Sequence, residues 1–285
     1  MNNMLLENKN FIVTGGSGGI GQKIVSILLS NGANVAVIYW PEEELKQLRD
    51  KFSHKLLTFV VDVSDRVKVE KVFNQIISDF RRVDGLINMA AVNEPIKPFV
   101  ENSMEEWVSA ININLLGTVC CCRQILPHLI EKGGGKIINF SGGGATSPFP
   151  CFSAYATSKA AVVRFTETIS EEVKLCGVSI NAVAPGAINT AMLDNMLKAG
   201  HKVLGDEQYA KVVKQKKDGG DDVNLVCELV LFLLSDKSFD LTGKLISAKW
   251  DNWKEWNEDE IKKLNNSSEY TLRRIDNKYF EEVKK

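Results

Sequence analysis

The stretch Phe11-Ile-Val-Thr-Gly-Gly-Ser-Gly-Gly-Ile-Gly21 decides how this chain folds. Four apolar or β-branched residues lead into a run of glycines, and a segment with helical periodicity, Ile20–Leu29, follows directly. This order predicts a buried strand, a tight turn and a helix. Glycine lets the backbone approach a ligand closely, and the amino end of a helix attracts negative charge. The turn is therefore a candidate site for the pyrophosphate of a dinucleotide, although any tight strand-to-helix connection can use the same residues.

Strand-like and helical segments alternate along the rest of the chain. Apolar runs rich in β-branched residues stand at Phe11–Thr14, Val35–Tyr39, Leu56–Val61, Val83–Asn88, Lys136–Phe140, Val178–Val183 and Lys244–Ser247. Segments with helical periodicity stand between them, at Ile20–Leu29, Glu42–Phe52, Val67–Arg82, Met104–Leu129, Ala154–Cys176 and Val223–Leu234. Runs that are apolar almost throughout are typical of strands covered on both faces. The pattern predicts an α/β fold with a doubly wound parallel sheet.

The chain changes character near its end, where Trp250, Trp253 and Trp256 sit among charged and amide residues. We predict a single domain over residues 1–247 and a C-terminal extension over residues 248–285. Large apolar rings are rarely left exposed on a polar tail, so we expect the extension to pack on its own domain or on a partner subunit.

The composition excludes several classes of partner. Lys and Arg number 35 against 36 Asp and Glu, so the chain has no basic surface for nucleic acid or anionic membrane. We find no signal peptide and no run of the roughly 20 apolar residues that span a bilayer, which predicts a cytoplasmic protein. The six cysteines fit neither a disulfide framework nor a zinc site, so no metal is predicted. The expected partner is a small molecule.

Tyr155 and Lys159 stand four residues apart in one predicted helix, so their side chains lie on one face, a turn apart. A tyrosine hydroxyl titrates near ~10 in water and is a poor base at neutral pH. A neighbouring ammonium and an oxidised nicotinamide ring both favour the phenolate. Together they would lower the pKa of the tyrosine by roughly one to three pKa units. Tyr155 would then exchange a proton with a substrate oxygen while a hydride moves at carbon. Such pairs also occur by chance, and this one gains weight from the glycine-rich turn upstream.

The end of the second predicted strand bears on the choice of cofactor. Tyr39-Trp40 closes this strand, and Glu42, Glu43 and Glu44 follow it. In dinucleotide folds, an acidic residue at this place binds the ribose hydroxyls of NAD, or a basic residue binds the 2′-phosphate of NADP. No Lys or Arg stands in the glycine-rich turn or directly after the strand, and carboxylates repel a phosphate. We predict NAD as the cofactor, with NADP as the alternative.

These motifs, in this order, resemble the short-chain dehydrogenase/reductase family over about residues 8–247. The resemblance implies a Rossmann fold and an oxidoreductase that transfers a hydride between a nicotinamide cofactor and a hydroxyl or carbonyl carbon of a small polar metabolite. Asp62 corresponds to the family aspartate that contacts adenine, and Ile188 and Thr190 correspond to positions that hold the nicotinamide amide. The residues implied in cofactor binding are Gly15, Ser17, Gly19, Ile20, Gly21, Tyr39, Asp62, Val63, Asn88, Ala90, Tyr155, Lys159, Pro185, Gly186, Ile188 and Thr190.

The resemblance also assigns catalytic roles. Tyr155 would be the acid and base, Lys159 would bind the nicotinamide ribose and lower the pKa of Tyr155, and Asn114 would hold a water that links Lys159 to solvent. A buried asparagine can equally bridge helix backbone groups, which leaves a structural role for Asn114 open.

The chain departs from the family at Gly142, which stands thirteen residues before Tyr155, where the family has a serine that polarises the substrate carbonyl. Ser141 takes that role through a shifted backbone, Ser153 takes it, or the donor is missing. Loss of such a donor would slow chemistry by ~10²-fold or more without abolishing cofactor binding. A rival hypothesis follows, in which the chain is a catalytically impaired dinucleotide-binding sensor or structural subunit.

The substrate should lie over the nicotinamide at the carboxyl ends of the strands. Candidate walls are residues 92–96, residues 149–152 and a predicted helical excursion within residues 190–222. Family members are generally dimers or tetramers built from two long helices, here Met104–Leu129 and Ala154–Cys176. The resemblance therefore implies a homotetramer, with a homodimer as the alternative.

Overall fold

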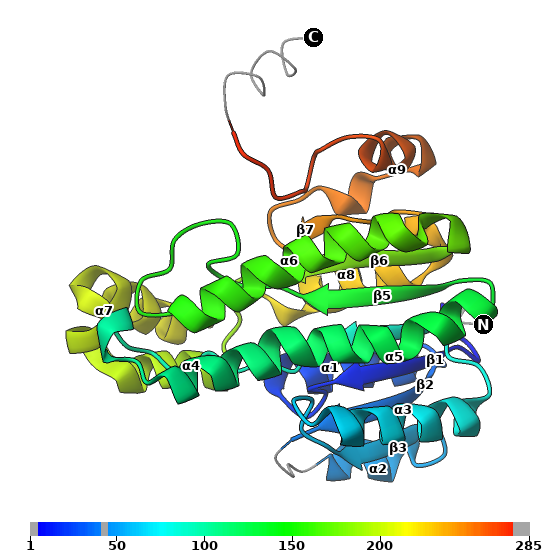
Figure 1. The fold of residues 1–285 in the computed structure, drawn as a ribbon, viewed down its shortest axis with the longest axis horizontal. Coiled ribbons are helices and arrows are strands. Elements are labelled where there is room, and N and C mark those ends of the chain that lie inside the picture. The colour runs from blue at the N-terminus through cyan, green and yellow to red at the C-terminus, as the bar shows by residue number, and fades with distance from the viewer. Residues whose placement is uncertain (1–4, 41–44, 276–285) are drawn as a thin grey trace.

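The computed structural model describes residues 5–40 and 45–275, and its centre is one parallel sheet (Figure 1). The strands are β1 (Asn10–Thr14), β2 (Asn34–Tyr39), β3 (Leu56–Val60), β4 (Gly85–Asn88), β5 (Gly135–Phe140), β6 (Val178–Ala184) and β7 (Leu245–Ser247). They lie in the order β3-β2-β1-β4-β5-β6-β7, and every neighbouring pair is parallel. The order reverses between β1 and β4, and open α/β sheets bind ligands at such a crossover.

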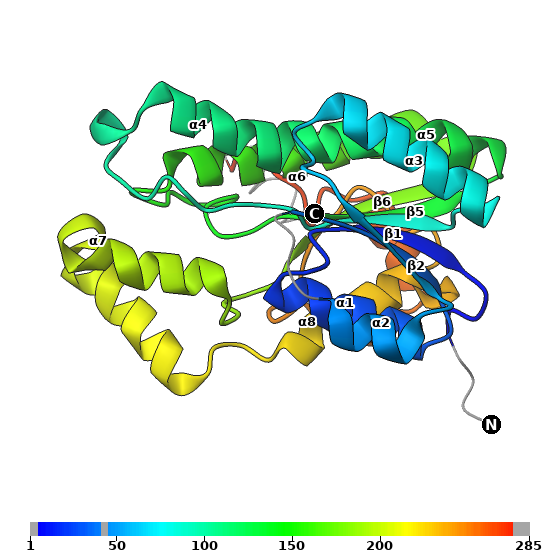
Figure 2. The same ribbon diagram turned by 90° about the horizontal axis from the view of Figure 1, so that it is seen from below.

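Helices cover both faces of the sheet, as Figure 2 shows. On one side lie α1 (Gly19–Ser30), α2 (Lys46–Phe52) and α8 (Val223–Leu234). On the other lie α3 (Arg66–Phe80), α4 (Met104–Ile111), α5 (Thr118–Glu131) and α6 (Ser153–Val173). The strands are buried between these layers, and Ile12, Val37 and Ile138 are almost fully covered. The predicted α/β doubly wound fold is confirmed. The predicted helix Glu42–Phe52 begins in residues 41–44, which lie outside the described residues.

One long predicted helix differs from expectation. Between α4 and α5 the chain forms a π-helical segment, Asn112–Gly117, so three pieces replace the single helix Met104–Leu129. Contrary to our reading of the sequence, Met104–Glu131 is long and apolar enough to cross a membrane by length and composition alone. Half of its most apolar window is buried inside the fold, as in a core helix of a globular domain.

The predicted helical excursion is α7 (Ala191–Asp218), which projects beyond the carboxyl ends of the strands (Figures 1 and 2). Its backbone leaves the helical region at Gly200, with a φ of 76°, and at Gly205, with a φ of 74°. Residues without a side chain adopt this left-handed region at little cost, so the two glycines divide α7 into shorter helical pieces.

The C-terminal extension packs on the domain through two of its three tryptophans. It contains a 3₁₀ turn, η5 (Trp253–Glu255), and a short helix, α9 (Glu258–Asn265). Trp253 is buried, and its ring packs against Phe232 of α8 with 5.7 Å between ring centroids. Trp256 and Tyr270 pack against each other, with 5.2 Å between ring centroids, and both contact the core of the domain. Trp250, in contrast, is exposed. The division of the chain at residue 247 stays a prediction.

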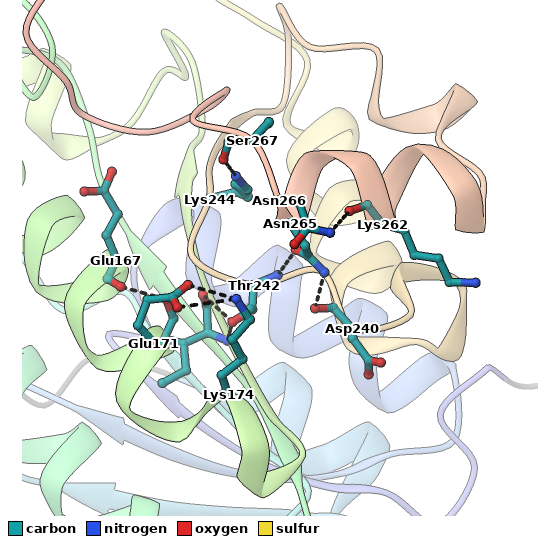
Figure 3. A network of polar contacts seen from close by, with 12 residues as sticks. Glu167, Glu171, Lys174, Asp240, Thr242, Lys244, Lys262, Asn265, Asn266 and Ser267 are labelled. Atoms are coloured by element: carbon teal, nitrogen blue, oxygen red, sulfur yellow. Dashed lines mark hydrogen bonds and ion pairs between the residues drawn. The ribbon is translucent and has the colours of Figure 1, made fainter.

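The extension also covers the outer edge of β7. The backbone N–H of Leu245 donates to the carbonyl of Tyr270 at 2.7 Å. The buried Lys244 donates to the carbonyl of Ser267 at 2.8 Å, and the side chain of Asn265 bonds the backbone of the loop before β7 (Figure 3). Unpaired groups at a sheet edge attract other strands, and here the chain itself satisfies them.

Candidate active site

A cavity of about 360 Å³ opens at the carboxyl ends of the strands, where their order reverses. Residues from the glycine-rich turn, from the ends of β2 and β3, from the loop after β4, and from α6 and the start of α7 surround it. The predicted site residues that line it are Gly15, Ser17, Gly19, Ile20, Gly21, Tyr39, Asp62, Val63, Ala90, Ser141, Tyr155, Lys159, Pro185 and Thr190. One cavity therefore brings together most of the side chains that the sequence singled out.

The glycine-rich turn forms one wall of the cavity because its backbone is packed too closely for side chains. Gly15 has a φ of 69°, and a β-carbon there would lie 2.7 Å from the backbone nitrogen of Ala90. The helix α1 begins at Gly19, and its N-cap residue, Gly18, offers no side-chain bond to the first turn. The positive end of the helix thus faces the cavity with backbone N–H groups, which fits a pyrophosphate.

The end of β2 forms the part of the cavity next to the glycine-rich turn, because β1 and β2 are paired. Tyr39 and Trp40 both line it, as does Asp62, which follows the neighbouring strand β3. The hydroxyl of Tyr39 accepts a hydrogen bond from Arg49 of α2 at 2.9 Å, and Arg49 also donates to Thr58 at 2.6 Å. Sequence reasoning missed Arg49, because only packing brings α2 back over the strand. The glutamates at positions 42 to 44 lie outside the described residues.

Tyr155 and Lys159 project from α6 into the other end of the cavity. The Nζ atom of Lys159 lies 5.7 Å from the ring centroid of Tyr155 and donates to the carbonyl of Phe140 at 2.9 Å. Burial raises the pKa of Tyr155 to about 12 and lowers the pKa of Lys159 to about 8. The lowering expected beside an oxidised nicotinamide stays a prediction, and in the protein alone the pKa of Tyr155 is raised. The reason is that desolvation of the phenol dominates, while the ammonium sits over the ring and against a carbonyl.

Asn114 is fully buried. Its Oδ1 atom accepts from the backbone N–H of Val92 at 2.8 Å, and its Nδ2 atom donates to the carbonyl of Val92 at 2.8 Å and to the hydroxyl of Ser158 at 3.0 Å. Asn114 therefore joins the loop after β4 to α6 and does not itself line the cavity. Its role in holding a water stays a prediction.

The loop 141–145 carries Gly142 at the position where the family has its serine. The hydroxyl of Ser141 is buried and donates to the carbonyl of Lys159 at 3.5 Å. Ser153 accepts a hydrogen bond from the indole nitrogen of Trp107 at 3.2 Å and lies outside the cavity lining. A β-carbon on Gly142 would collide with the hydroxyl oxygen of Tyr155. The phenol therefore lies directly against the backbone of Gly142.

Three predicted cofactor residues stand outside the lining. The side chain of Asn88 points into the protein and donates to Asn139 at 2.9 Å. Gly186 has a φ of 88° and packs against Asp221, whose carboxylate accepts from the N–H of Ala187 at 2.8 Å. Ile188 forms an isolated antiparallel bridge with Gly220. These contacts shape the loop that carries Pro185 and Thr190, and Asp221 is a second residue that the sequence did not reveal.

Val92, Ala191 and Met192 line the part of the cavity between the loop after β4 and the start of α7. Asn93, beside Val92, donates to the carbonyl of Met192 at 2.9 Å and so ties the loop after β4 to the start of α7. Residues 149–152 were expected to form another wall. Phe152 is buried and stacks on Phe149, with 4.2 Å between ring centroids. These two rings pack against each other outside the cavity lining.

Known proteins resemble the chain over most of its length. The family described as short chain dehydrogenase matches residues 9–200. The 3-oxoacyl-[acyl-carrier-protein] reductase FabG of Thermotoga maritima is 30% identical over 247 residues, which cover 85% of this chain and 97% of the relative. An NAD⁺-bound xylitol dehydrogenase has a TM-score of 0.78 and 25% identity, over 85% of this chain and 98% of that chain.

A second solved structure, ElxO with NADP bound, has a TM-score of 0.73 and 28% identity, over 84% of this chain and 96% of that chain. One structural relative thus holds NAD⁺ and another holds NADP. The glycine-lined wall and the helix terminus described above fit the pyrophosphate that both cofactors share. The chain belongs to the short-chain dehydrogenase/reductase family and is an NAD- or NADP-dependent oxidoreductase.

Proposed function

We propose that this protein reduces a ketone or aldehyde of a small polar metabolite to an alcohol, with Tyr155 as the proton donor. The observation that carries the proposal is the placement of Lys159 over the ring of Tyr155, 5.7 Å from its centroid, at the wall of the cavity. With a pKa of about 12, Tyr155 is protonated at neutral pH, and a protonated phenol is suited to give a proton to a carbonyl oxygen.

A bound nicotinamide supplies the hydride in this reaction. The carbonyl carbon forms the new C–H bond, the π-electron pair moves to oxygen, and the hydroxyl of Tyr155 donates its proton to that oxygen. Lys159 stabilises the resulting tyrosinate by its positive charge. Tyr155 then regains a proton from solvent, so each alcohol formed consumes one hydride and one proton.

The test compares Tyr155→Phe with wild type, using NADH or NADPH and a set of ketones. We expect turnover to fall by about 10²- to 10⁴-fold, because the general acid is lost. Cofactor affinity should remain, since the ring is kept. Tyr270→Phe is the matched control, because Tyr270 lies in the C-terminal extension against Trp256 and should not affect turnover. Equal turnover in wild type and the Tyr155 variant would refute the role of this phenol.

We propose further that NAD is preferred over NADP. Among the described residues that line the cavity, Lys159 is the only Lys or Arg, and it lies at the catalytic end. Arg49 is the nearest identified cation at the Tyr39 end, and its guanidinium is already held by Tyr39 and Thr58. An unpartnered guanidinium would serve a 2′-phosphate better than one engaged in this way.

Titration calorimetry measures this preference directly. NADH should bind more tightly than NADPH, and the reverse order would overturn the proposal. Arg49→Ala then locates any affinity for the 2′-phosphate, because it should weaken NADPH alone if Arg49 reaches that group. Lys51→Ala is the control on the same helix, because its ammonium lies over the ring of Phe52.

We also propose that the chain forms a homo-oligomer through the outer face of the α4–α6 layer, as a tetramer or a dimer. Met104, Val108 and Ile130 are exposed apolar residues of this layer, and apolar side chains gathered on one face favour association. Light scattering on the purified protein measures the mass in solution, and a monomer at micromolar concentration would reject the assembly.

A further inference from the structure

Reduction of a carbonyl builds negative charge on its oxygen before the proton has fully arrived. Enzymes that handle such charge place two or more hydrogen-bond donors around the oxygen, and the loss of one donor slows the reaction by about 10²- to 10³-fold. In the reaction proposed above, Tyr155 is one donor. The question is which group of this chain is the second.

The nearby side-chain hydroxyls are engaged elsewhere. Ser141 donates to the carbonyl of Lys159 at 3.5 Å and is buried. Ser153 accepts from the indole nitrogen of Trp107 at 3.2 Å. Lys159 donates to the carbonyl of Phe140 at 2.9 Å. The side chains around Tyr155 therefore offer no obvious second donor, and the backbone beside it has to be considered.

That backbone is a tight turn. The N–H of Ala145 donates to the carbonyl of Gly142 at 3.3 Å, so residues 142 to 145 form a β-turn. Gly144, the third residue of the turn, has a φ of 82°, whereas Gly143 is not in the left-handed region. A positive φ at the third residue without one at the second is the pattern of a type II turn.

The turn leaves several amide groups unused. Within residues 5–40 and 45–275, the backbone N–H groups of Gly142, Gly143 and Gly144 donate no hydrogen bond. By comparison, the N–H of Ser141 donates to the carbonyl of Val183 at 2.8 Å and belongs to the sheet. The unused N–H groups begin at the residue that touches the catalytic phenol.

The hydroxyl of Tyr155 lies close to the first residue of this turn. The hydroxyl oxygen of Tyr155 lies where a β-carbon of Gly142 would stand. A carbonyl oxygen that accepts a hydrogen bond from Tyr155 must lie within about 3 Å of that hydroxyl, and the hydroxyl itself touches the backbone of Gly142. Glycine at both positions keeps side chains out of this space.

We propose that the backbone N–H groups of Gly142 and Gly143 donate to the substrate oxygen and act as the second donor. The inference rests on the proposed reductase function. As the hydride forms the C–H bond, the π-electron pair moves to oxygen, where the two amides stabilise the charge until Tyr155 delivers its proton. Only hydrogen bonds to the amides are made and lost, so the balance of the reaction is unchanged.

The experiment uses two substitutions at one position. Gly143→Pro removes the N–H, and proline suits this second position of a type II turn because its φ is already near −60°. Gly143→Ala keeps the N–H, and its β-carbon would meet the ring of Phe149 at an ordinary 3.6 Å. Both variants are assayed as full chains with NADH or NADPH and with 2,3-butanedione, cyclohexanone and ethyl acetoacetate as probes.

We expect kcat of the proline variant to fall by about 10²-fold relative to the alanine variant, with unchanged cofactor affinity. Equal kcat in the two variants would overturn the inference and leave the reductase function standing. If wild type reduces none of the probes with either cofactor, the reductase function fails for these ketones, and the amide measurement below then decides the inference alone.

A second measurement does not depend on turnover or on the folding of the proline variant. Isobutyramide is a carbonyl compound that is not reduced, and it is added to cofactor-loaded, ¹⁵N-labelled wild-type protein. The amide protons of Gly142 and Gly143 should move downfield as they bond its oxygen, while that of Ser141 should not move. The absence of such a shift at saturating isobutyramide, or of any binding, would overturn the inference.

Discussion

The hydroxyl oxygen of Tyr155 lies against Gly142, in the space that a β-carbon at this position would occupy. A side chain at 142 therefore has to displace the phenol. We expect Gly142→Ser and Gly142→Ala to lower kcat by roughly 10²-fold, because a misplacement of about 1 Å costs that much, while cofactor affinity is retained. Steady-state kinetics and calorimetry check both points. A serine variant faster than wild type would show instead that the chain lacks a donor that the serine hydroxyl supplies.

The pH dependence of catalysis should follow Lys159. Its pKa is about 8, so its charge disappears as the pH rises through that value. Its ammonium favours the tyrosinate that forms when Tyr155 gives up its proton, so kcat/KM for reduction should decline above pH 8. Alcohol oxidation requires the tyrosinate as base and should speed up as the pH rises. Profiles in both directions between pH 6 and 10 test this, and two flat profiles would contradict it.

Lys159 also carries a prediction about stability. Burial lowers its pKa from 10.5 to about 8, so between these values the unfolded chain binds more protons than the folded protein. The free energy of unfolding of wild type therefore gains from this residue as the pH rises from 8 to 10.5. Lys159→Met lacks this dependence and should be more stable than wild type at pH 7, by about 1–3 kcal/mol after the lost hydrogen bond to Phe140 is counted.

Urea unfolding of both proteins at pH 7 and pH 10 measures the difference. The advantage of Lys159→Met should be largest at pH 7 and should shrink by pH 10. An advantage that is the same at both values would mean that the pKa of Lys159 is not depressed by folding.

The tryptophans of the extension should differ sharply in what they contribute. Trp253 is 4% exposed and packs on Phe232, with 5.7 Å between ring centroids, so Trp253→Ala should cost about 3–5 kcal/mol of stability. Trp250 is 74% exposed, and Trp250→Ala should change stability by no more than about 0.5 kcal/mol. Chemical denaturation of the two variants provides the comparison. Equal losses would mean that Trp250 is covered in solution, for instance by a partner subunit.

Much of the fold was predictable because it depends on local patterns. Val35–Tyr39 and Lys136–Phe140 are short apolar runs rich in β-branched residues, a pattern that can be recognised without the rest of the fold. The structure confirms them as β2 and β5. Tyr155 and Lys159 were also placed correctly on one helix face, since a spacing of four residues settles that question wherever the helix lies.

What the sequence could not supply depends on contacts between distant segments. Arg49 reaches Tyr39 only because α2 packs back over the sheet, and Asp221 reaches Gly186 from the far end of α7. The rise that burial causes in the pKa of Tyr155 could not be predicted for the same reason, because the extent of burial is set by the whole fold. The π-helical turn at Asn112–Gly117 has no signature in hydrophobic periodicity either.

The hydrogen bond between Leu245 and Tyr270 has a consequence for solubility. A parallel sheet that ends in a bare strand can recruit a strand from a second molecule and grow into an aggregate. In this protein the segment that carries Tyr270 covers that strand. A truncation before Tyr270 would expose the edge of β7. The shortened protein should then aggregate in a concentration-dependent way, even where its cavity is intact.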